Sequence, residues 1–284
     1  MESLHSLKRK IQSVKKTSKI TEAMKLVSIV KLKRERERLL KIQDYYNEFY
    51  NVVSSIVDSV DDLKFLEHKN AKDATLYIVI NSSLGLCGAY NNNINKAILS
   101  VLKPNDQLIL LGKKAFSYYK NHELGSQILN QIDLTDNQIN MDEVQAIRSI
   151  ILELFQNGSV NKVKIAYTKF VNAMKFDPNI VSLLPLDKEL LKTKKVEKLN
   201  LAKVEFLPNE QELINALIPS YIDTFLYGAL VESKVCEFAS RRNAMDAATN
   251  NANDLTDKYN LKFNKLRQAK ITAEIIEMMS GQNE

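Results

Sequence analysis

The turn Gly85-Leu86-Cys87-Gly88 is the segment of this chain whose residue types and spacing most resemble those of a ligand-binding or catalytic site. It follows an apolar segment and precedes a helical one, which is where dinucleotide-binding folds place their phosphate-binding turn. The spacing is GxxG rather than GxGxxG, and the chain contains no P-loop motif. No histidine lies near Cys87 in sequence to activate its thiol. We therefore expect a tight strand-to-helix turn with a buried cysteine and no bound cofactor.

The other residues that could carry chemistry are dispersed. The histidines are isolated among polar neighbours and predicted to lie at the surface: His5, His68 and His122. With only two cysteines and no Cys/His cluster, neither a disulfide framework nor a zinc site is expected. The acidic pairs Asp61-Asp62 and Glu35/Glu37 are interpreted as solvated or ion-paired groups on charged helices. No catalytic constellation is present, so we expect no catalytic, cofactor or metal site in this chain.

Positive charge is concentrated at the N-terminus. The first 41 residues hold 13 of the 40 Lys and Arg residues but only 4 of the 34 Asp and Glu residues. Such a helix suits an acidic protein surface, nucleic acid or anionic lipid, or is simply a solvated coiled-coil surface. No aromatic platform for stacking bases precedes Tyr45, which disfavours nucleic acid. The apolar runs are too short to span a bilayer and no secretory signal is visible, so we expect an intracellular protein.

Few turn-forming residues interrupt the helices and strands that must position these residues. The 284 residues include only 7 glycines and 5 prolines, which points to long helices and away from an all-β fold. All of them except Gly281 lie between residues 85 and 228. We therefore expect an N-terminal coiled-coil helix over residues 1–68, a compact domain over 69–208 and a C-terminal coiled-coil helix over 209–284.

Each terminal segment carries a seam, meaning apolar positions at 3,4 spacing that face a partner helix. The seam of the N-terminal segment begins with Leu4, Leu7, Ile11 and Val14. Its spacing then shifts at Ile20, Met24 and Val27, which we interpret as a stutter. The regular 3,4 spacing is found again at Leu39, Ile42, Tyr46, Phe49, Val53, Ile56, Val60 and Leu63. The second consists of Phe238, Arg241, Met245, Ala248, Ala252, Leu255, Tyr259, Lys262, Leu266, Ala269, Ala273 and Ile276. The two helices are predicted to pair with each other, antiparallel, with Val53 and Ile56 near Phe238. Ser3 is the expected N-cap of the first helix.

The middle segment alternates between strand and helix patterns. Strands are expected at residues 76–80, 107–111 and 162–170, and helices at 91–102, 113–120 and 141–156. This alternation predicts a mostly parallel, doubly wound sheet. The fold class is therefore α/β with long helices: an antiparallel coiled coil of the terminal helices plus a Rossmann-like α/β domain.

The motifs at both ends resemble one known family, the gamma subunits of F-type ATP synthases. The segment from Lys10 to Arg34 is similar to the family's "I-x-S-V-x-x-T-x-K-I-T-x-A-M-x-x-V" pattern. The segments 240–255 and 265–281 are similar to "R-x-x-A-M-x-x-A-T-x-N-A" and "N-x-x-R-Q-A-x-I-T-x-E-I". The turn at 85–88 and the segment from Pro208 to Ser233 also match.

This resemblance implies a non-catalytic central stalk that rotates inside a hexamer of alpha and beta subunits and couples ATP turnover to torque and proton flow. The positions that match hexamer-facing positions of the family are Met24, Arg241, Arg267, Gln268 and Thr272. It further implies an epsilon-like subunit and a membrane rotor ring as partners, no cofactor and no nucleic acid. The protein would be peripheral, at the cytoplasmic face of the cell membrane, without a signal peptide or transmembrane segment.

Two departures from the family pattern keep an alternative open. Ser82-Ser83-Leu84 stands where the family usually has Asp-Arg before Gly85, and Phe206-Leu207 stands where it usually has a glutamate before Pro208. The alternative is a paralogous shaft of a similar ATPase motor, coupled to something other than a proton-conducting ring. Two hypotheses from other classes are a nucleic-acid-binding coiled coil, which would bind with a steep salt dependence, and an enzyme with a site around residues 85–91, which would bind nucleotide.

Overall fold

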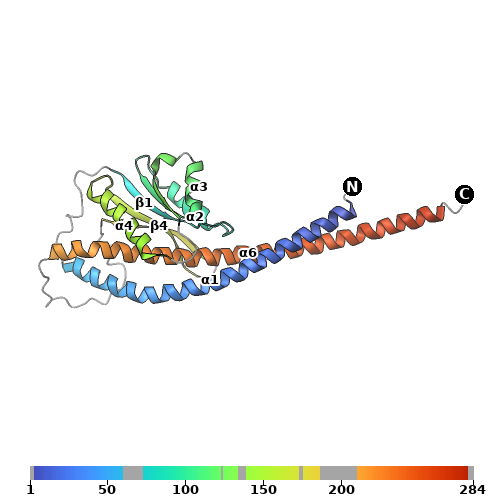
Figure 1. Ribbon diagram of the computed structural model, residues 1–284, viewed down its shortest axis with the longest axis horizontal. Coiled ribbons are helices and arrows are strands. Elements are labelled where there is room, and N and C mark those ends of the chain that lie inside the picture. The colour runs from blue at the N-terminus through green and yellow to red at the C-terminus, as the bar shows by residue number, and fades with distance from the viewer. Residues whose placement is uncertain are drawn as a thin grey trace. The chain divides into compact units, whose positions relative to one another are not determined.

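The computed structural model describes residues 3–59, 73–122, 124–133, 139–172, 175–185 and 210–280. The chain divides into two compact units: unit 1 is Met1–Val30 with Arg241–Glu284, and unit 2 is Lys31–Ser240. Two long helices, α1 (Leu4–Ser59) and α6 (Glu210–Ser280), supply residues to both units (Figure 1). Several residues named above lie outside the described residues: Val60, Asp61, Asp62, Leu63, His68, Phe206, Leu207, Pro208 and Gly281.

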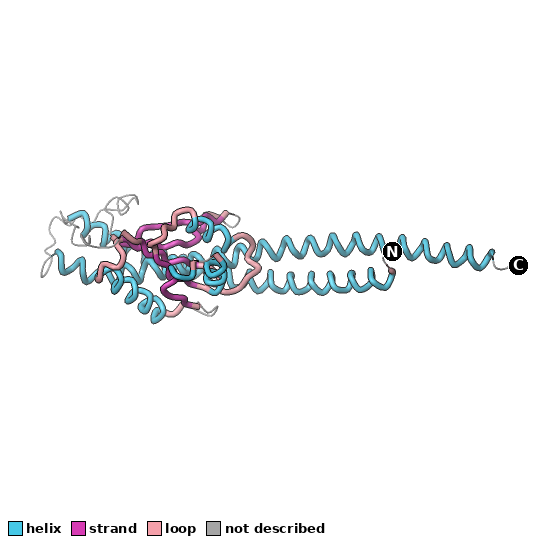
Figure 2. The backbone as a smooth tube through the Cα atoms, turned by 90° about the horizontal axis from the view of Figure 1, so that it is seen from above, coloured by secondary structure: helices cyan, strands magenta, loops and turns pink. Residues whose placement is uncertain are grey.

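Unit 2 is built on a five-stranded sheet with the strand order β3-β2-β1-β4-β5. The strands are magenta in Figure 2. The strands are β1 (Thr75–Ile80), β2 (Gln107–Leu111), β3 (Ile128–Ile132), β4 (Lys162–Phe170) and β5 (Phe176–Leu184). β1 pairs in parallel with both β2 and β4, and β2 pairs in parallel with β3, whereas β5 is antiparallel to β4. The expected mostly parallel sheet is confirmed. Its central strands read as continuous apolar runs because both faces of the sheet are covered.

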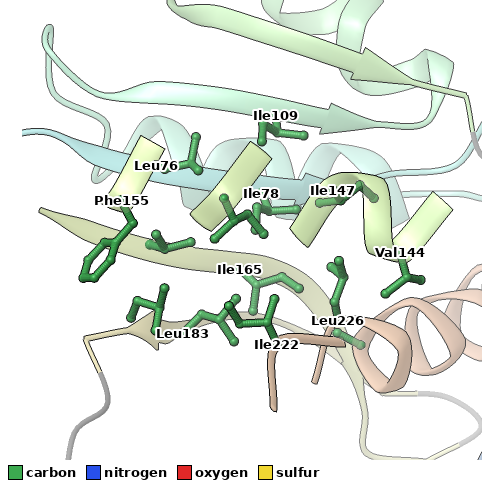
Figure 3. Packing of buried hydrophobic residues seen from close by; sticks show 14 of the residues in the cluster. Leu76, Ile78, Ile109, Val144, Ile147, Phe155, Ile165, Leu183, Ile222 and Leu226 are labelled. Atoms are coloured by element: carbon green, nitrogen blue, oxygen red, sulfur yellow. The ribbon is translucent and has the colours of Figure 1, made fainter. Parts of the chain in front are cut away.

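Helices cover both faces of this sheet. α2 (Tyr90–Leu99), α3 (Lys113–Asn121) and α4 (Met141–Gln156) follow β1, β2 and β3 along the chain, and a 3-10 turn, η2 (Gly125–Gln127), precedes β3. On one face, strand residues pack with α4 and α6 in a cluster that includes Leu76, Ile78, Ile109, Val144, Ile147, Phe155, Ile165, Leu183, Ile222 and Leu226 (Figure 3). On the other face, they pack with α2 and α3 in a cluster that includes Tyr77, Val79, Ile94, Ile98, Leu108, Leu110, Ala115, Tyr119 and Ala166. The result is a three-layer α/β/α core.

Local sequence explains where α4 begins and ends. The Asn140 side chain accepts a hydrogen bond from the backbone N–H of Asp142, and Asp142 and Glu143 place negative charge in the first turn. Asn157 caps the C-terminus, and Gly158 follows with φ +71°, a conformation that glycine adopts without strain. These bounds match the predicted 141–156.

Steric constraints require a glycine at position 112, between β2 and α3. Its φ is +95°, and a Cβ atom built there would lie 2.4 Å from the backbone oxygen of Asn81. The backbone N–H of Gly112 also donates to the carbonyl of Ile132 at 2.9 Å. The strand-to-helix turn therefore requires the close backbone approach that only glycine permits.

Within unit 2, α1 and α6 run antiparallel, as predicted, but in a different register. Phe238 lies under the ammonium of Lys31, with Nζ 5.3 Å from the ring centroid, and Tyr46 packs on Phe225. The prediction that Val53 and Ile56 lie near Phe238 is therefore wrong. Gly228 lies inside α6, within the predicted helix over residues 209–284. A Cβ atom at Gly228 would be 3.5 Å from the Tyr46 ring, which is an ordinary van der Waals distance, so α6 passes next to Tyr46 at this position.

In unit 1, residues 4–30 of α1 pair antiparallel with α6 through a polar seam. Thr21 and Thr249 share a hydroxyl–hydroxyl hydrogen bond of 2.7 Å, and the Ser18 hydroxyl donates to Asn253 at 2.9 Å. The predicted stutter is wrong, because Thr21 and Ser28 are buried whereas Ile20 and Val27 are 60% and 55% exposed. The 3,4 spacing continues through small polar residues, which a search for apolar positions passes over. Ser3 caps α1 as expected, accepting the Ser6 N–H at 3.1 Å.

Two strands were absent from the sequence-based prediction. β3 alternates half-buried and exposed positions at the sheet edge and includes the polar residues Asn130 and Gln131. β5 contains Pro178 and is an antiparallel edge strand, where proline is tolerated. Both were missed because they lack the continuous apolar run that marks the central strands. None of the described helices is long and apolar enough to cross a membrane.

Candidate interaction surface of the paired helices

Met24 and Arg241, two of the positions singled out by the resemblance, lie in the part of unit 1 where both helices are present. Lys25, the neighbour of Met24 on α1, forms a salt bridge of 3.2 Å with Asp246 on α6, so Met24 lies beside this part of α6. Met24 is half-buried, and its carbonyl accepts the Ser28 hydroxyl at 2.7 Å. Arg241 is 6% exposed, so most of its side chain is covered. These two residues are therefore held by the helix pair itself, with limited surface to offer a partner.

Arg267, Gln268 and Thr272 lie on α6 in a stretch where every described side chain is exposed, residues 267–279. α1 begins at Leu4, and the antiparallel register leaves the end of α6 beyond its reach. The Thr272 hydroxyl donates back to the Gln268 carbonyl at 2.9 Å, which is an ordinary helical contact. Exposed apolar residues accompany them: Ile271, Ile275, Ile276, Met278 and Met279. This segment combines cationic, amide and apolar groups on a single helix.

The five singled-out positions thus form two groups. Met24 and Arg241 lie on either side of the Lys25–Asp246 salt bridge, and Arg267, Gln268 and Thr272 follow farther along α6. At 1.5 Å per residue, Asp246 and Arg267 are separated by roughly 30 Å along the helix. No compact pocket can contain both groups, so any partner that meets all five positions must extend along the shaft.

The Gly85–Gly88 turn packs against α6 within unit 2. Cys87 is buried, its backbone carbonyl accepts the Ser240 hydroxyl at 2.7 Å, and its sulfur accepts the Asn91 amide at 3.2 Å. Asn91 also accepts the Ser82 backbone N–H at 2.9 Å. Leu86 has φ +63°, an uncommon conformation for a leucine. The expectation of a tight turn with a buried cysteine is confirmed, and the turn joins the sheet to α6.

Burial dominates the electrostatics next to this turn. Cys87, Tyr90 and Cys236 form a small cluster between α2 and α6, with Phe170 and Phe176 against it. Burial raises the pKa of the Cys236 thiol and holds the pKa of the Tyr90 phenol well above its ordinary value. Both groups are therefore neutral at physiological pH. A thiol in this state is a poor nucleophile and contributes to packing instead.

Buried charges in unit 2 were not foreseen as a structural feature. Glu35 is only 3% exposed and forms salt bridges with Arg34 at 3.1 Å and Arg38 at 2.9 Å. Lys234 and Glu237, also buried, pair at 3.5 Å on α6. The i,i+3 spacing of Glu35 with Arg38 and of Lys234 with Glu237 was the available signal, but it does not show that these side chains are buried. Glu35 is ion-paired, as expected, and Glu37, His5 and His122 are exposed.

A second charged group lies where the parallel strands end. Asp133, after β3, accepts hydrogen bonds from Lys113 at 2.8 Å and from the Ser83 hydroxyl at 2.7 Å. These hydrogen bonds hold the pKa of Asp133 below its ordinary value. The hydroxyl of Ser83 therefore serves as a hydrogen-bond donor to the Asp133 carboxylate. In the described part of the chain, no group of three or more His, Cys, Asp or Glu side chains is placed to hold a metal ion.

Comparison with known sequences identifies relatives over the full chain. A family model described as ATP synthase matches residues 3–283. A protein of Ureaplasma parvum serovar 3 named ATP synthase gamma chain is 46% identical over 285 residues, covering 99% of this chain and all of the relative. The ATP synthase gamma chain of Malacoplasma penetrans is 40% identical, and the alignment covers 99% of each protein.

Solved structures give the same picture of the fold. A chain of the Euglena gracilis mitochondrial ATP synthase, in a structure of OSCP, F1 and c-ring, superposes with a TM-score of 0.70 at 18% identity. That match covers 99% of this chain and 93% of the other. A chain from the central stalk and c-ring of the Tetrahymena thermophila enzyme gives 0.63 at 24% identity, covering 81% and 99%. The fold of this chain is thus shared with these structures.

Proposed function

The chain belongs to the ATP synthase gamma chain family, and we propose that it works as the rotating central stalk of an F-type ATP synthase inside a hexamer of alpha and beta subunits. In this role residues 1–68 and 209–284 form the helical shaft and residues 69–208 the α/β domain. The relatives named above carry the name ATP synthase gamma chain, and none of them supports a paralogous motor, a nucleic-acid-binding protein or an enzyme in its own right.

One observation carries the mechanical part of this proposal. The end of α6 is exposed over residues 267–279 and includes Arg267, Gln268 and Thr272. A single helix that exposes isoleucine and methionine side chains suits enclosure by other proteins, because apolar surface is stabilised when it leaves water. Arg267 offers a planar fork of donors for a partner carboxylate. Torque then passes between the surrounding subunits and the shaft through these contacts.

Other partners follow from the same role. We propose that an epsilon-like subunit and a proton-conducting membrane ring bind the opposite end of the stalk, and that the protein is peripheral at the cytoplasmic face of the membrane. The cited structure from Euglena gracilis contains a c-ring, which supports a ring partner for this chain by family analogy. Purification of a tagged chain from detergent-solubilised membranes tests this part. Recovery of alpha and beta subunits with an unrelated protein in place of the ring would overturn it.

The hexamer contacts are tested with the double variant Arg267→Ala/Gln268→Ala in the reconstituted complex. Each lost hydrogen bond to a charged group removes about 1.5–3 kcal/mol, so torque and coupled ATP hydrolysis should fall steeply while the variant chain stays folded. The matched control is Asn250→Ala/Lys258→Ala, which also removes one amide and one cation from exposed positions of α6. The control should behave as wild type. Wild-type torque with the Arg267→Ala/Gln268→Ala shaft would refute the assigned contacts.

A further inference from the structure

The helices α2 and α3 end at the same edge of the sheet of unit 2. Each helix connects the end of one parallel strand with the beginning of the next, so both helices end where β2 and β3 begin. The loops that follow the two helices are joined, because the Gln127 side-chain amide donates to the carbonyls of Lys103 and Pro104, each at 2.8 Å. The two loops therefore form one continuous surface at this edge.

Three exposed lysines lie on this surface, and we call them the basic edge. Lys96 and Lys120 lie in the last turns of α2 and α3, and Lys103 lies in the loop after α2. A helix C-terminus attracts cations, which explains part of this placement. A helix end carries only about half an elementary charge, so Lys96 and Lys120 leave a net positive charge at each end. Lys103 lies outside both helices and has no such local role.

Acidic residues do not neutralise the basic edge. The only acidic residue between residues 90 and 122 is Asp106, which is 2% exposed and accepts two backbone N–H groups at 2.8 Å each. Glu153 is exposed at the end of α4, on the other face of the sheet, and Asp73 precedes the central strand β1 and accepts a side-chain amide at 3.3 Å. Glu123, which follows α3, lies outside the described residues. The α2/α3 side of this edge is therefore basic.

Two apolar side chains accompany the lysines. Val101, in the loop after α2, is 44% exposed, and Leu129, near the start of β3, is 45% exposed. Protein interfaces usually have a contiguous apolar centre that is depleted of lysine, and single apolar residues between lysines do not provide one. An anionic lipid surface suits this pattern better, because mobile headgroups can meet lysines at any spacing and single apolar side chains can enter the headgroup region.

Resting on the proposed function, which places the chain beside a membrane ring, we propose that the basic edge contacts anionic lipid headgroups around that ring. The ammonium groups of Lys96, Lys103 and Lys120 bind lipid phosphates, and Val101 and Leu129 enter the headgroup region. Lipid headgroups exchange laterally, so a contact of this kind persists while the stalk turns. The membrane then supports unit 2 directly as well as through the ring.

The test must report on the basic edge alone, because the first 41 residues hold 13 Lys and Arg residues and also attract anionic vesicles. Asn105→Cys places a bimane label in the exposed loop after α2 of the full-length chain, while the native cysteines are buried. Phosphatidylglycerol vesicles that contain nitroxide-labelled lipid should quench this label, and less so at high salt. Phosphatidylcholine vesicles with the same nitroxide lipid should not. The control label at Ser149→Cys, exposed on α4, should stay bright with both.

Two triple variants with equal loss of charge then test the lysines. Lys96→Gln/Lys103→Gln/Lys120→Gln should raise the lipid concentration for half-maximal quenching at position 105 by about tenfold or more. The matched control removes three exposed lysines elsewhere in unit 2 and should change it by less than about twofold: Lys114→Gln/Lys169→Gln/Lys175→Gln. All six side chains are exposed, so circular dichroism should show unchanged helix content.

The outcomes separate this inference from the proposed function. Equal shifts for the two triple variants, equal quenching by phosphatidylcholine vesicles, or no quenching at position 105 would overturn the lipid contact. The assay contains no other subunit, so its result does not depend on assembly. Failure of the tagged wild-type chain to copurify with alpha and beta subunits would instead contradict the proposed function.

Discussion

The two units bury different kinds of side chain although the same two helices run through both. Unit 2 closes a three-layer core of aliphatic and aromatic residues on both faces of a sheet. The buried residues of unit 1 are mostly small or polar: Leu7, Thr21, Ser28, Arg241, Met245, Thr249, Ala252 and Thr256. The difference teaches that the burial of apolar area and the display of apolar surface are separated in this chain. Unit 2 holds the fold by burying apolar area, whereas unit 1 leaves several large apolar side chains exposed, among them Ile20, Val27 and Val30.

The sharpest test of this separation exchanges isoleucine for alanine in each unit. Ile78 is fully buried in the central strand of unit 2, and Ile78→Ala should lower the free energy of unfolding by about 2–5 kcal/mol. Ile20 is 60% exposed on α1, and Ile20→Ala should change it by less than about 0.5 kcal/mol. Urea unfolding followed by circular dichroism measures both. Similar losses at the two sites would remove the basis of the comparison.

Backbone geometry in unit 2 gives the next largest effect. Gly112→Ala forces a Cβ atom against the Asn81 carbonyl at a positive φ, so we expect a loss of roughly 2 kcal/mol or more in unfolding free energy. Gly125→Ala is the matched control, because a Cβ atom there meets nothing within 4 Å. The control should unfold at nearly the wild-type urea concentration. A Gly112→Ala protein as stable as the control would show that the turn can rearrange freely.

The polar seam of unit 1 should respond more weakly, and not additively. Thr21→Val or Thr249→Val alone removes one partner of a buried hydroxyl pair and should cost about 1 kcal/mol. The double variant leaves neither hydroxyl in the seam and should cost less than the sum of the single variants. Amide hydrogen exchange along α6 near Thr249 reports this locally. Strict additivity would mean that the two hydroxyl groups do not depend on each other.

The smallest effect is expected at the Lys25–Asp246 salt bridge. Its side chains are 25% and 54% exposed, so its coupling energy should be no more than about 0.5 kcal/mol at low salt and disappear at high salt. A double-mutant cycle with Lys25→Ala and Asp246→Ala, measured by hydrogen exchange at both salt concentrations, checks this. A coupling above ~1 kcal/mol that persists in salt would make this salt bridge a main support of unit 1.

Sequence patterns predicted unit 2 better than unit 1. The central strands and α4 emerge at or within a residue of their predicted bounds, because apolar runs and caps are local signals. The seam of unit 1 was misplaced at Ile20 and Val27, because hydrophobicity was taken to mark burial where small polar residues allow closer packing. The predicted register of the two helices was wrong because register depends on contacts between residues far apart in sequence, such as Lys31 with Phe238 and Tyr46 with Phe225.

The candidate site was predictable only in part. Sequence motifs singled out Arg267, Gln268 and Thr272 as candidate positions. The structure shows why they are exposed: α1 begins at Leu4, and the end of α6 extends past the part that pairs with α1. The burial of Arg241 and the exposure of Val27 could not be read from either helix alone. Such properties depend on which residues of the partner helix lie opposite, and that register is set by contacts between distant parts of the chain.

The polar pairing of Thr21 with Thr249 also has a consequence for how the protein is made. These residues are 228 positions apart, so at ribosomal rates of 5–20 residues per second the N-terminal helix waits roughly 10–50 s for its partner to be synthesised. Unit 2, whose residues lie between, can assemble during that interval. The exposed lysines of the waiting helix keep it solvated, and its seam near Thr21 and Ser28 is formed by small polar side chains. The chemistry that makes unit 1 a weak core thus suits a segment that is translated first and paired last.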